Sequence, residues 1–101
     1  MIARIWHGVT RVEHADEYHR YLLETGVVDY RGTPGNRGVY VLRDIRGDEA
    51  HFLTISLWDS LDAIRQFAGV DYRKPRYWPK DKEYLLELEP EAQHYEVLFA
   101  P

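Results

Sequence analysis

Short segments rich in alternating apolar, β-branched and aromatic residues predict four strands along the chain. The first covers residues 2–9, and the second covers residues 38–46. The third covers residues 50–58 and follows the second after a turn at Gly47-Asp48-Glu49, so these two strands are expected to form a hairpin. The fourth covers residues 92–99.

Apolar residues at helical spacing predict two helices between these strands. Thr10 and Glu13 have the spacing of a capping box, so the first helix is expected to begin there and to end at Gly26. Asp59 or Ser60 is expected to cap the second helix, which has an apolar face and ends at Gly69.

Two further segments lack a clear period. Residues 31–38 form a turn-rich connector, which lacks the Lys-Ser/Thr ending of a phosphate-binding loop. Residues 70–90 are expected to be irregular or to form short helical turns, because Pro75 and Pro79 exclude a long helix.

The resulting order, β-α-β-β-α-β, predicts one α+β domain over residues 1–101, with a ferredoxin-like fold. The expected four-stranded antiparallel sheet has the order 4-1-3-2, with helices on one face. Strand alternation places Val39 and Val41 on one side of the second strand and Tyr40 and Leu42 on the other, so both faces are apolar. A homodimer that covers the bare face is the expected partner arrangement.

Composition narrows the class of protein. Hydrophobic residues make up 45% of the 101 residues, which fits a folded domain with one modest core. The net charge of −4 argues against nucleic acid as the main partner, and no apolar run approaches the roughly 18 residues of a membrane span. The chain has no cysteine and its start lacks a signal-peptide layout, so a cytoplasmic location is expected.

Several short motifs, in order, resemble the antibiotic biosynthesis monooxygenase family, whose members are dimeric α+β barrels. They are Ile5-Trp6-His7-Gly8, Tyr18-x-x-Tyr21-Leu22, Pro34-Gly35-Asn36, Ser56-Leu57-Trp58-Asp59-Ser60, Ile64-x-x-Phe67-Ala68-Gly69 and His94-Tyr95-Glu96-Val97. The resemblance implies an α+β barrel dimer with a substrate pocket between the helices and the sheet.

Two histidines are the candidate catalytic residues, because imidazole is the natural general base near neutral pH. We take the first strand as parallel to the third, which brings His7, Trp58 and His94 to one end of the sheet and leaves His51 at the other. Whether His7 and His94 share a face depends on strand register. A metal site is not expected, since no metal-binding histidine motif is present.

Aromatic residues with polar tips are the candidate lining of the substrate pocket, and ordinary core packing is the alternative reading. These residues are Trp58, Tyr18, Phe67, Tyr72, Tyr77 and Trp78.

The resemblance implies a monooxygenase that acts without a cofactor on a small, electron-rich aromatic or polyketide-like substrate. A base would remove a proton, and the resulting anion would react with O₂. No Gly-x-Gly-x-x-Gly fingerprint for a flavin or nucleotide is present.

Three alternatives remain open. Heme binding or degradation occurs in another branch of the family, which uses a histidine on or after the second helix and an asparagine on the first strand; residues 59–80 here contain no histidine, and residues 1–9 contain no asparagine. The other two are a non-redox cyclase or isomerase and a dimer that binds a small ligand without catalysis.

Overall fold

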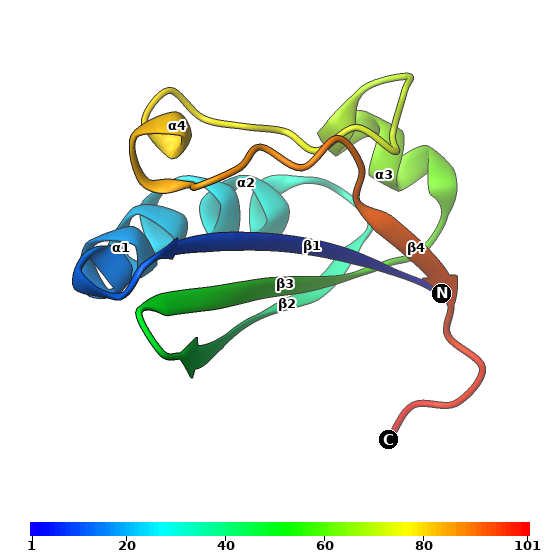
Figure 1. Cartoon of the computed structure of the whole chain (residues 1–101). Coiled ribbons are helices and arrows are strands. Elements are labelled where there is room, and N and C mark those ends of the chain that lie inside the picture. Colours follow the sequence, from blue (N-terminus) through cyan, green and yellow to red (C-terminus); the bar gives the residue numbers. More distant parts are fainter.

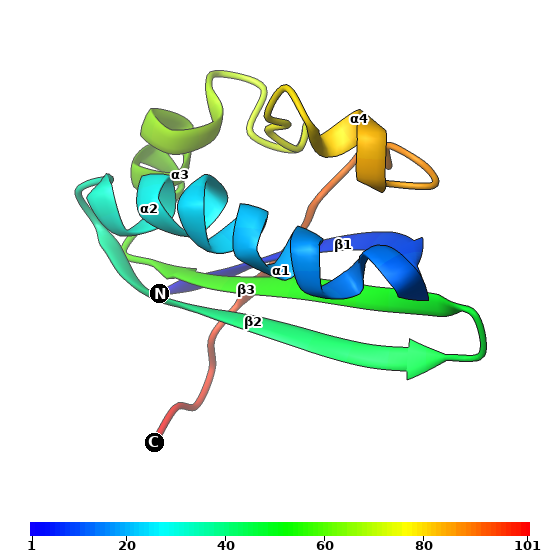
Figure 2. The same ribbon diagram turned by 90° about the vertical axis from the view of Figure 1, so that its left-hand side faces the viewer.

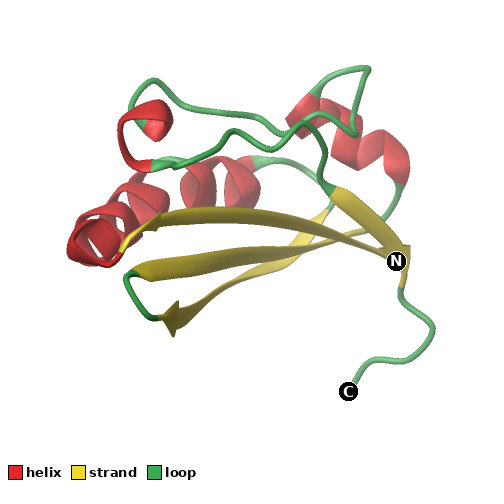
Figure 3. Cartoon of the chain, viewed as in Figure 1, coloured by secondary structure: helices red, strands yellow, loops and turns green.

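A four-stranded antiparallel sheet carries all the helices on one of its faces (Figures 1 and 3). The computed structural model describes all residues, 1–101. The elements are β1 (Ile2–Arg11), a 3₁₀ turn (Val12–His14), α1 (Ala15–Glu24), α2 (Gly26–Gly32), β2 (Asn36–Arg46), β3 (Glu49–Trp58), α3 (Leu61–Ala68), α4 (Asp81–Tyr84) and β4 (Gln93–Glu96). This is the predicted α+β, ferredoxin-like fold.

The strand order is β2-β3-β1-β4, which confirms the predicted order. The expected parallel pairing of β1 with β3 was wrong. These strands are antiparallel, with Ile2 opposite Trp58 and Arg11 opposite Glu49. The reason is topological: the helical crossover returns the chain so that β2 runs in the direction of β1, and the hairpin then reverses β3.

The core lies between the sheet and the helices, and strand alternation selects the side chains that enter it. One cluster of buried residues gathers around Trp6, Tyr18 and Phe52. A second gathers around Trp58 and Phe67. Figure 2 shows that α1 and α2 lie along the sheet, while α3, α4 and the segment that joins them form the outer layer.

The start of the first helix differs from the prediction. Thr10 does not cap a helix, because β1 continues through Arg11 in its pairing with β3. Thr10 is fully buried, and its hydroxyl donates to the carbonyl of Arg11. The helix α1 begins only at Ala15, after the 3₁₀ turn. The ladder with β3 therefore outweighs a local capping signal at this point.

Other boundaries shift by a few residues. The helix α1 ends at Glu24, and Gly26 begins a further short helix, α2, that was not predicted. Ser60 caps α3 as expected, since its hydroxyl accepts a hydrogen bond from the Ala63 amide. The last strand is shorter than predicted, and residues 97–101 leave the sheet on its uncovered side (Figure 2). None of the helices is long and apolar enough to span a membrane.

The uncovered face of the sheet is apolar, as the alternation predicted. Tyr40, Leu42 and Tyr95 on this face are 60%, 44% and 56% exposed. Leu98 and Phe99 in the C-terminal segment are also exposed. The chain therefore presents large apolar side chains to solvent on this sheet face, beside the polar residues His7, Asp44 and His51.

Candidate functional site

A buried arginine and a histidine meet on the helix-covered face of the sheet. Arg4 of β1 lies directly opposite His94 of β4, so the two side chains project to the same side. Arg4 is only 1% exposed, which is unusual for an arginine. Its Nη1 group donates to Nε2 of His94 over 3.0 Å.

All other hydrogen-bond partners of Arg4 are neutral as well. Nη1 also donates to the carbonyl of Tyr72, and Nη2 donates to the carbonyl of Lys74 over 3.2 Å. The Nε group has no partner. Burial lowers the pKa of Arg4, yet a guanidinium stays protonated in proteins. The site therefore holds a buried positive charge without a counter-charge, an arrangement that costs several kcal/mol in real proteins.

His94 is the neutral acceptor of this pair. Burial, followed by the positive charges of Arg4 and Arg73, lowers the pKa of His94 to about 4. The imidazole is therefore uncharged at neutral pH, and Nε2 accepts a hydrogen bond from the guanidinium. The ring of Tyr72 packs edge-on against His94, with 4.9 Å between the ring centroids.

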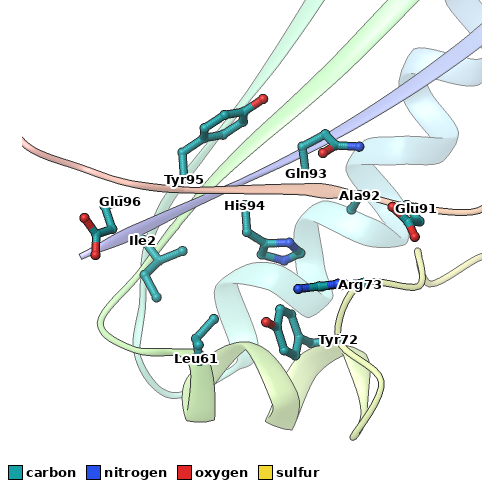
Figure 4. Close-up of a pocket in the computed structure, with 10 residues that line it drawn as sticks. All are labelled: Ile2, Leu61, Tyr72, Arg73, Glu91, Ala92, Gln93, His94, Tyr95 and Glu96. Atoms are coloured by element: carbon teal, nitrogen blue, oxygen red, sulfur yellow. The ribbon is translucent and has the colours of Figure 1, made fainter.

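An open pocket of about 430 Å³ adjoins His94 (Figure 4). Figure 4 shows the side chains of Tyr72, Arg73 and His94 facing one another between β4 and α3, while Gln93 and Tyr95 point away. Leu61 and Ile2 supply apolar contacts, and Glu91 and Glu96 lie at its ends. The pocket thus combines an aromatic wall with a neutral imidazole and an exposed cation.

A much smaller cavity lies between the helices and the sheet. Its volume is about 20 Å³, which is room for roughly one water molecule. Its lining includes Arg4, Tyr30 and Thr54, and the hydroxyls of the last two residues are 3.1 Å apart. Arg4 therefore borders this inner cavity, while its partner His94 borders the open pocket.

A buried carboxylate also lines the inner cavity. Asp81 of α4 is 3% exposed, and it accepts hydrogen bonds from the Tyr18 hydroxyl at 2.9 Å and the Trp78 amide at 2.6 Å. Burial raises the pKa of Asp81 above its usual range. Asp81 and Arg4 are thus two buried groups of opposite charge at one cavity, each bonded to other partners. Buried, perturbed charges beside a cavity are typical of functional sites.

The six aromatic residues predicted to line a pocket separate into four environments. Trp58 and Phe67 are buried in the core cluster beneath α3. Tyr18 and Trp78 line the inner cavity. Tyr72 lines the open pocket, and Tyr77 lies between Trp6 and the carbonyl of Glu89. The structure therefore does not bring these six residues together around one pocket.

His7 lies on the opposite face of the sheet from His94. Its Nδ1 is bonded to a carboxylate oxygen of Glu89, and its Nε2 lies 3.0 Å from Nδ1 of His51. The predicted grouping of His7 with Trp58 and His94 was wrong for His7. Trp58 and His94 lie at the end where β1 begins, opposite Ile2 and Arg4, whereas antiparallel β3 brings His51 beside His7. The two candidate bases therefore face different surroundings.

Two residues of the site escaped the sequence analysis. Arg4 and Trp6 are two residues apart on β1 and therefore lie on the same face. A charged residue at a core position was thus the signal that could have identified Arg4. Asp81 gave no such signal, since it lies in a segment without periodicity. No group of three or more histidine, aspartate or glutamate side chains is placed to hold a metal ion.

The sequence profile of the antibiotic biosynthesis monooxygenase family matches residues 3–74. The chain belongs to the antibiotic biosynthesis monooxygenase family. In this family member, the matched range includes Arg4 and Tyr72, whereas Asp81 and His94 lie beyond it. No curated protein sequence matches the chain.

Solved structures of low sequence identity share the fold over nearly the whole chain. A candidate antibiotic biosynthesis monooxygenase from Bacillus cereus has 10% identity and a TM-score of 0.69, with 99% of this chain and 95% of the other covered. The heme-degrader MhuD from Mycobacterium tuberculosis, with two hemes bound in its active site, has 17% identity and a TM-score of 0.66, with coverage of 100% and 99%.

A third structure, a candidate antibiotic biosynthesis monooxygenase from Bacteroides thetaiotaomicron, has 21% identity and a TM-score of 0.60, with coverage of 97% and 90%. At these identities the structural likeness establishes the fold of this family member and leaves its chemistry to the site.

Proposed function

We propose that the chain is a monooxygenase that oxidises a small, electron-rich aromatic substrate with O₂ and without a bound cofactor. Family membership over residues 3–74 supports this class of reaction. The observation that carries the proposal is the pairing of neutral His94 with the buried positive charge of Arg4 beside an aromatic-walled pocket. A base and an anion-stabilising group are what proton removal from such a substrate requires.

The proposed reaction begins when a base removes an acidic proton from a CH₂ carbon of the substrate. The substrate anion gives one electron to O₂, and the resulting radical and superoxide combine to form a C–O bond. The peroxide anion takes up a proton, and water is lost together with the remaining hydrogen of that carbon. One oxygen atom stays in the product as a carbonyl, and the other leaves as water.

His94 is the base that we favour of the two candidate histidines, because it borders the pocket on the helix side. Arg4 has to release Nε2 of His94 before this nitrogen can take up a proton. Its low pKa arises in part from the charge of Arg4. A substrate anion beside Arg4 offsets that charge, so the pKa of His94 rises as the proton is transferred. His7 would serve only a site on the opposite face of the sheet.

Oxygen uptake with anthrones, which carry the required CH₂ carbon, tests the proposal. We expect oxygen uptake, with one ¹⁸O atom from ¹⁸O₂ in the product. In His94→Gln the rate of uptake is expected to fall at least about tenfold, since a general base contributes about 10²- to 10⁴-fold. His19→Gln, on the exposed side of α1, is the matched control. If His7→Gln lost oxygen uptake while His94→Gln kept full turnover, the base would be His7 on the other face, and this result would contradict the assignment.

Heme binding is the second candidate function, since a heme-degrader is among the structures that share the fold. The pocket offers no free histidine to ligate heme iron. Nε2 of His94 is bonded to Arg4, and no other histidine lines this pocket. A heme titration tests this candidate, and we expect no Soret shift. A shift that is lost in His94→Gln would favour heme binding over the oxygenase.

A comparison of products with and without O₂ separates the oxygenase from a non-redox cyclase or isomerase. Turnover under nitrogen would indicate proton-transfer chemistry alone. Saturable binding of a substrate that is never converted would indicate a ligand-binding protein.

We also propose that the uncovered sheet face pairs with a second copy of the chain. The exposed apolar side chains on this face, among them Tyr40 and Leu42, support a homodimer. Sedimentation at micromolar concentration is expected to give the dimer mass, and Leu42→Lys is expected to give the monomer. A monomeric mass for the unaltered chain would contradict this assembly.

A further inference from the structure

We propose that Arg4 is the receptor for a carboxylate, so that the site takes an aromatic acid as its ligand. This inference deepens the proposed function, because it names the substrate class of the same site. It rests on the hydrogen-bond pattern and burial of the guanidinium rather than on the oxygenase chemistry.

The guanidinium has one edge that the protein leaves largely unused. Nη1 has two acceptors, the Tyr72 carbonyl and His94. On the other edge, Nε has no hydrogen-bond partner and Nη2 has a single bond of 3.2 Å to the Lys74 carbonyl, while burial lowers the pKa of Arg4 and the nearby Tyr30 hydroxyl acts to raise it. A carboxylate binds a guanidinium through two parallel N–H···O bonds, and the Nε–Nη2 edge offers that pair of donors.

The charge of Arg4 favours the same ligand. Its acceptors in the protein are two carbonyls and a neutral imidazole, none of which carries a negative charge. An incoming carboxylate would supply the missing counter-charge in a dry environment, where hydrogen bonds between ions are stronger than neutral ones. A neutral ligand of the same shape would leave the buried charge uncompensated.

The space around Arg4 determines the size and shape of the rest of the ligand. The inner cavity at Arg4 has room for about one water molecule, whereas the open pocket next to His94 measures about 430 Å³. Tyr72 provides an aromatic wall there. Arg4 does not line the open pocket, so a carboxylate reaches it from there once His94 or the 72–74 backbone releases the guanidinium. We therefore place the carboxylate at Arg4 and a one- or two-ring body against Tyr72.

A structural role for Arg4 is the competing explanation, since its bonds join β1 to β4 and to the 72–74 segment. Replacing Arg4 by Met leaves these three acceptors without a donor under either explanation, so a change in melting temperature does not separate the two. Binding does separate them. A receptor predicts affinity for a carboxylate that depends on Arg4, whereas a purely structural arginine predicts none.

The experiment compares 1-naphthoate with its neutral analogue 1-naphthamide by calorimetry and thermal shift. We expect the full chain to bind the acid about tenfold or more tighter than the amide, the range that a charge-assisted hydrogen bond supplies. Binding is expected to be lost in Arg4→Met and unchanged in Arg11→Met, which removes an exposed arginine from the same strand.

Arg4→Lys is the second variant, and it keeps the test decisive if Arg4→Met does not fold. Lysine retains the charge but has no bidentate edge, so weaker binding of the acid is expected. In the unaltered chain, 1-naphthoate is also expected to shift one arginine Nε–H resonance that is absent from Arg4→Lys. Equal affinity for acid and amide, or undiminished binding in either Arg4 variant, would overturn the proposal.

The outcome is independent of the oxygenase assignment. Binding of the acid with no oxygen uptake would leave the receptor standing and remove the proposed oxygenase. Oxygen uptake together with equal affinity for the acid and the amide would leave the oxygenase standing and remove the carboxylate receptor.

Discussion

The two faces of the sheet carry similar residue types but place them in different surroundings. The helix-covered face buries Arg4 beside neutral His94, with aromatic rings packed around them. The uncovered face carries the contacting pair His7 and His51, both partly buried, together with exposed Tyr40 and Leu42. An imidazole pairs with an uncompensated charge on one face and with a carboxylate on the other. The layer of helices, and not the residue type, therefore determines which imidazole lies beside a buried positive charge.

The largest expected difference between the faces is in packing. Phe67 is 4% exposed and contacts Tyr30 and Trp58, so Phe67→Ala is expected to lower the free energy of unfolding by about 3–5 kcal/mol. Leu42→Ala on the uncovered face is expected to cost less than about 1 kcal/mol in the monomer. Urea unfolding measures both. Equal losses would show that the faces are packed alike.

Glycine substitutions give a smaller difference. A Cβ atom at Gly8 would lie 2.3 Å from the Trp6 ring and 2.9 Å from Leu85 on the helix side, so Gly8→Ala is expected to cost about 1–3 kcal/mol through overpacking. A Cβ at Gly32, at the end of α2, meets no atom within 4 Å. Gly32→Ala is expected to be neutral or slightly stabilising, and thermal unfolding compares the two. A harmless Gly8→Ala would contradict the close packing under α4.

The pH dependence of stability is the next effect. The pKa of His94 is about 4 in the folded chain, below its ordinary value of 6.5. Between these pH values His94 binds a proton in the unfolded chain but not in the folded chain. Its contribution to stability therefore falls as the pH drops from 6.5 towards 4 and is constant above 6.5.

We expect this loss to be about 1–2 kcal/mol, after allowance for the partial exposure of the ring. Unfolding curves at pH 7 and pH 4.5 measure it, and His94→Gln should reduce the difference between them. An unchanged difference in His94→Gln would assign the acid sensitivity to other groups.

The smallest expected effect belongs to His7. Its contact with the Glu89 carboxylate is about one-third exposed on each side, and even fully charged pairs at the surface contribute about 0–1 kcal/mol. His7→Asn is therefore expected to change the free energy of unfolding by less than about 1 kcal/mol at pH 7. A larger loss, seen in urea titrations below the concentration of dimer formation, would show that the His7–His51 contact stabilises the uncovered face.

Periodicity predicted the fold because each strand and helix carries its own signal. The alternation of Val39 and Val41 with Tyr40 and Leu42 located the two faces of β2 correctly. The Ser60 cap was also predicted, since its bond to Ala63 is local. The Thr10 cap was wrong because pairing with a strand some forty residues away extended β1 through that position. Local signals fail where a distant partner competes for the same backbone.

The site could be predicted only in part, for the same reason. Parity on β1 puts Arg4 on the face of Trp6, and this much is contained in the sequence. The absence of a carboxylate beside Arg4 depends on how residues 72–94 fold back over β1. Asp81 acquires its buried position from Tyr18, which lies 63 residues earlier in the chain.

The sequence by itself determined the four strands, two of the helices, their order, the alternation of side chains within each strand and the apolar residues on both sides of the sheet, because these follow from periods of two and 3.6 residues. The tertiary structure decided which side the helices cover, that β1 and β3 run antiparallel and that His7 meets His51 instead of His94. It also decided that Arg4 is buried with neutral partners. Burial and charge pairing depend on contacts between segments far apart in the chain, which no local pattern records.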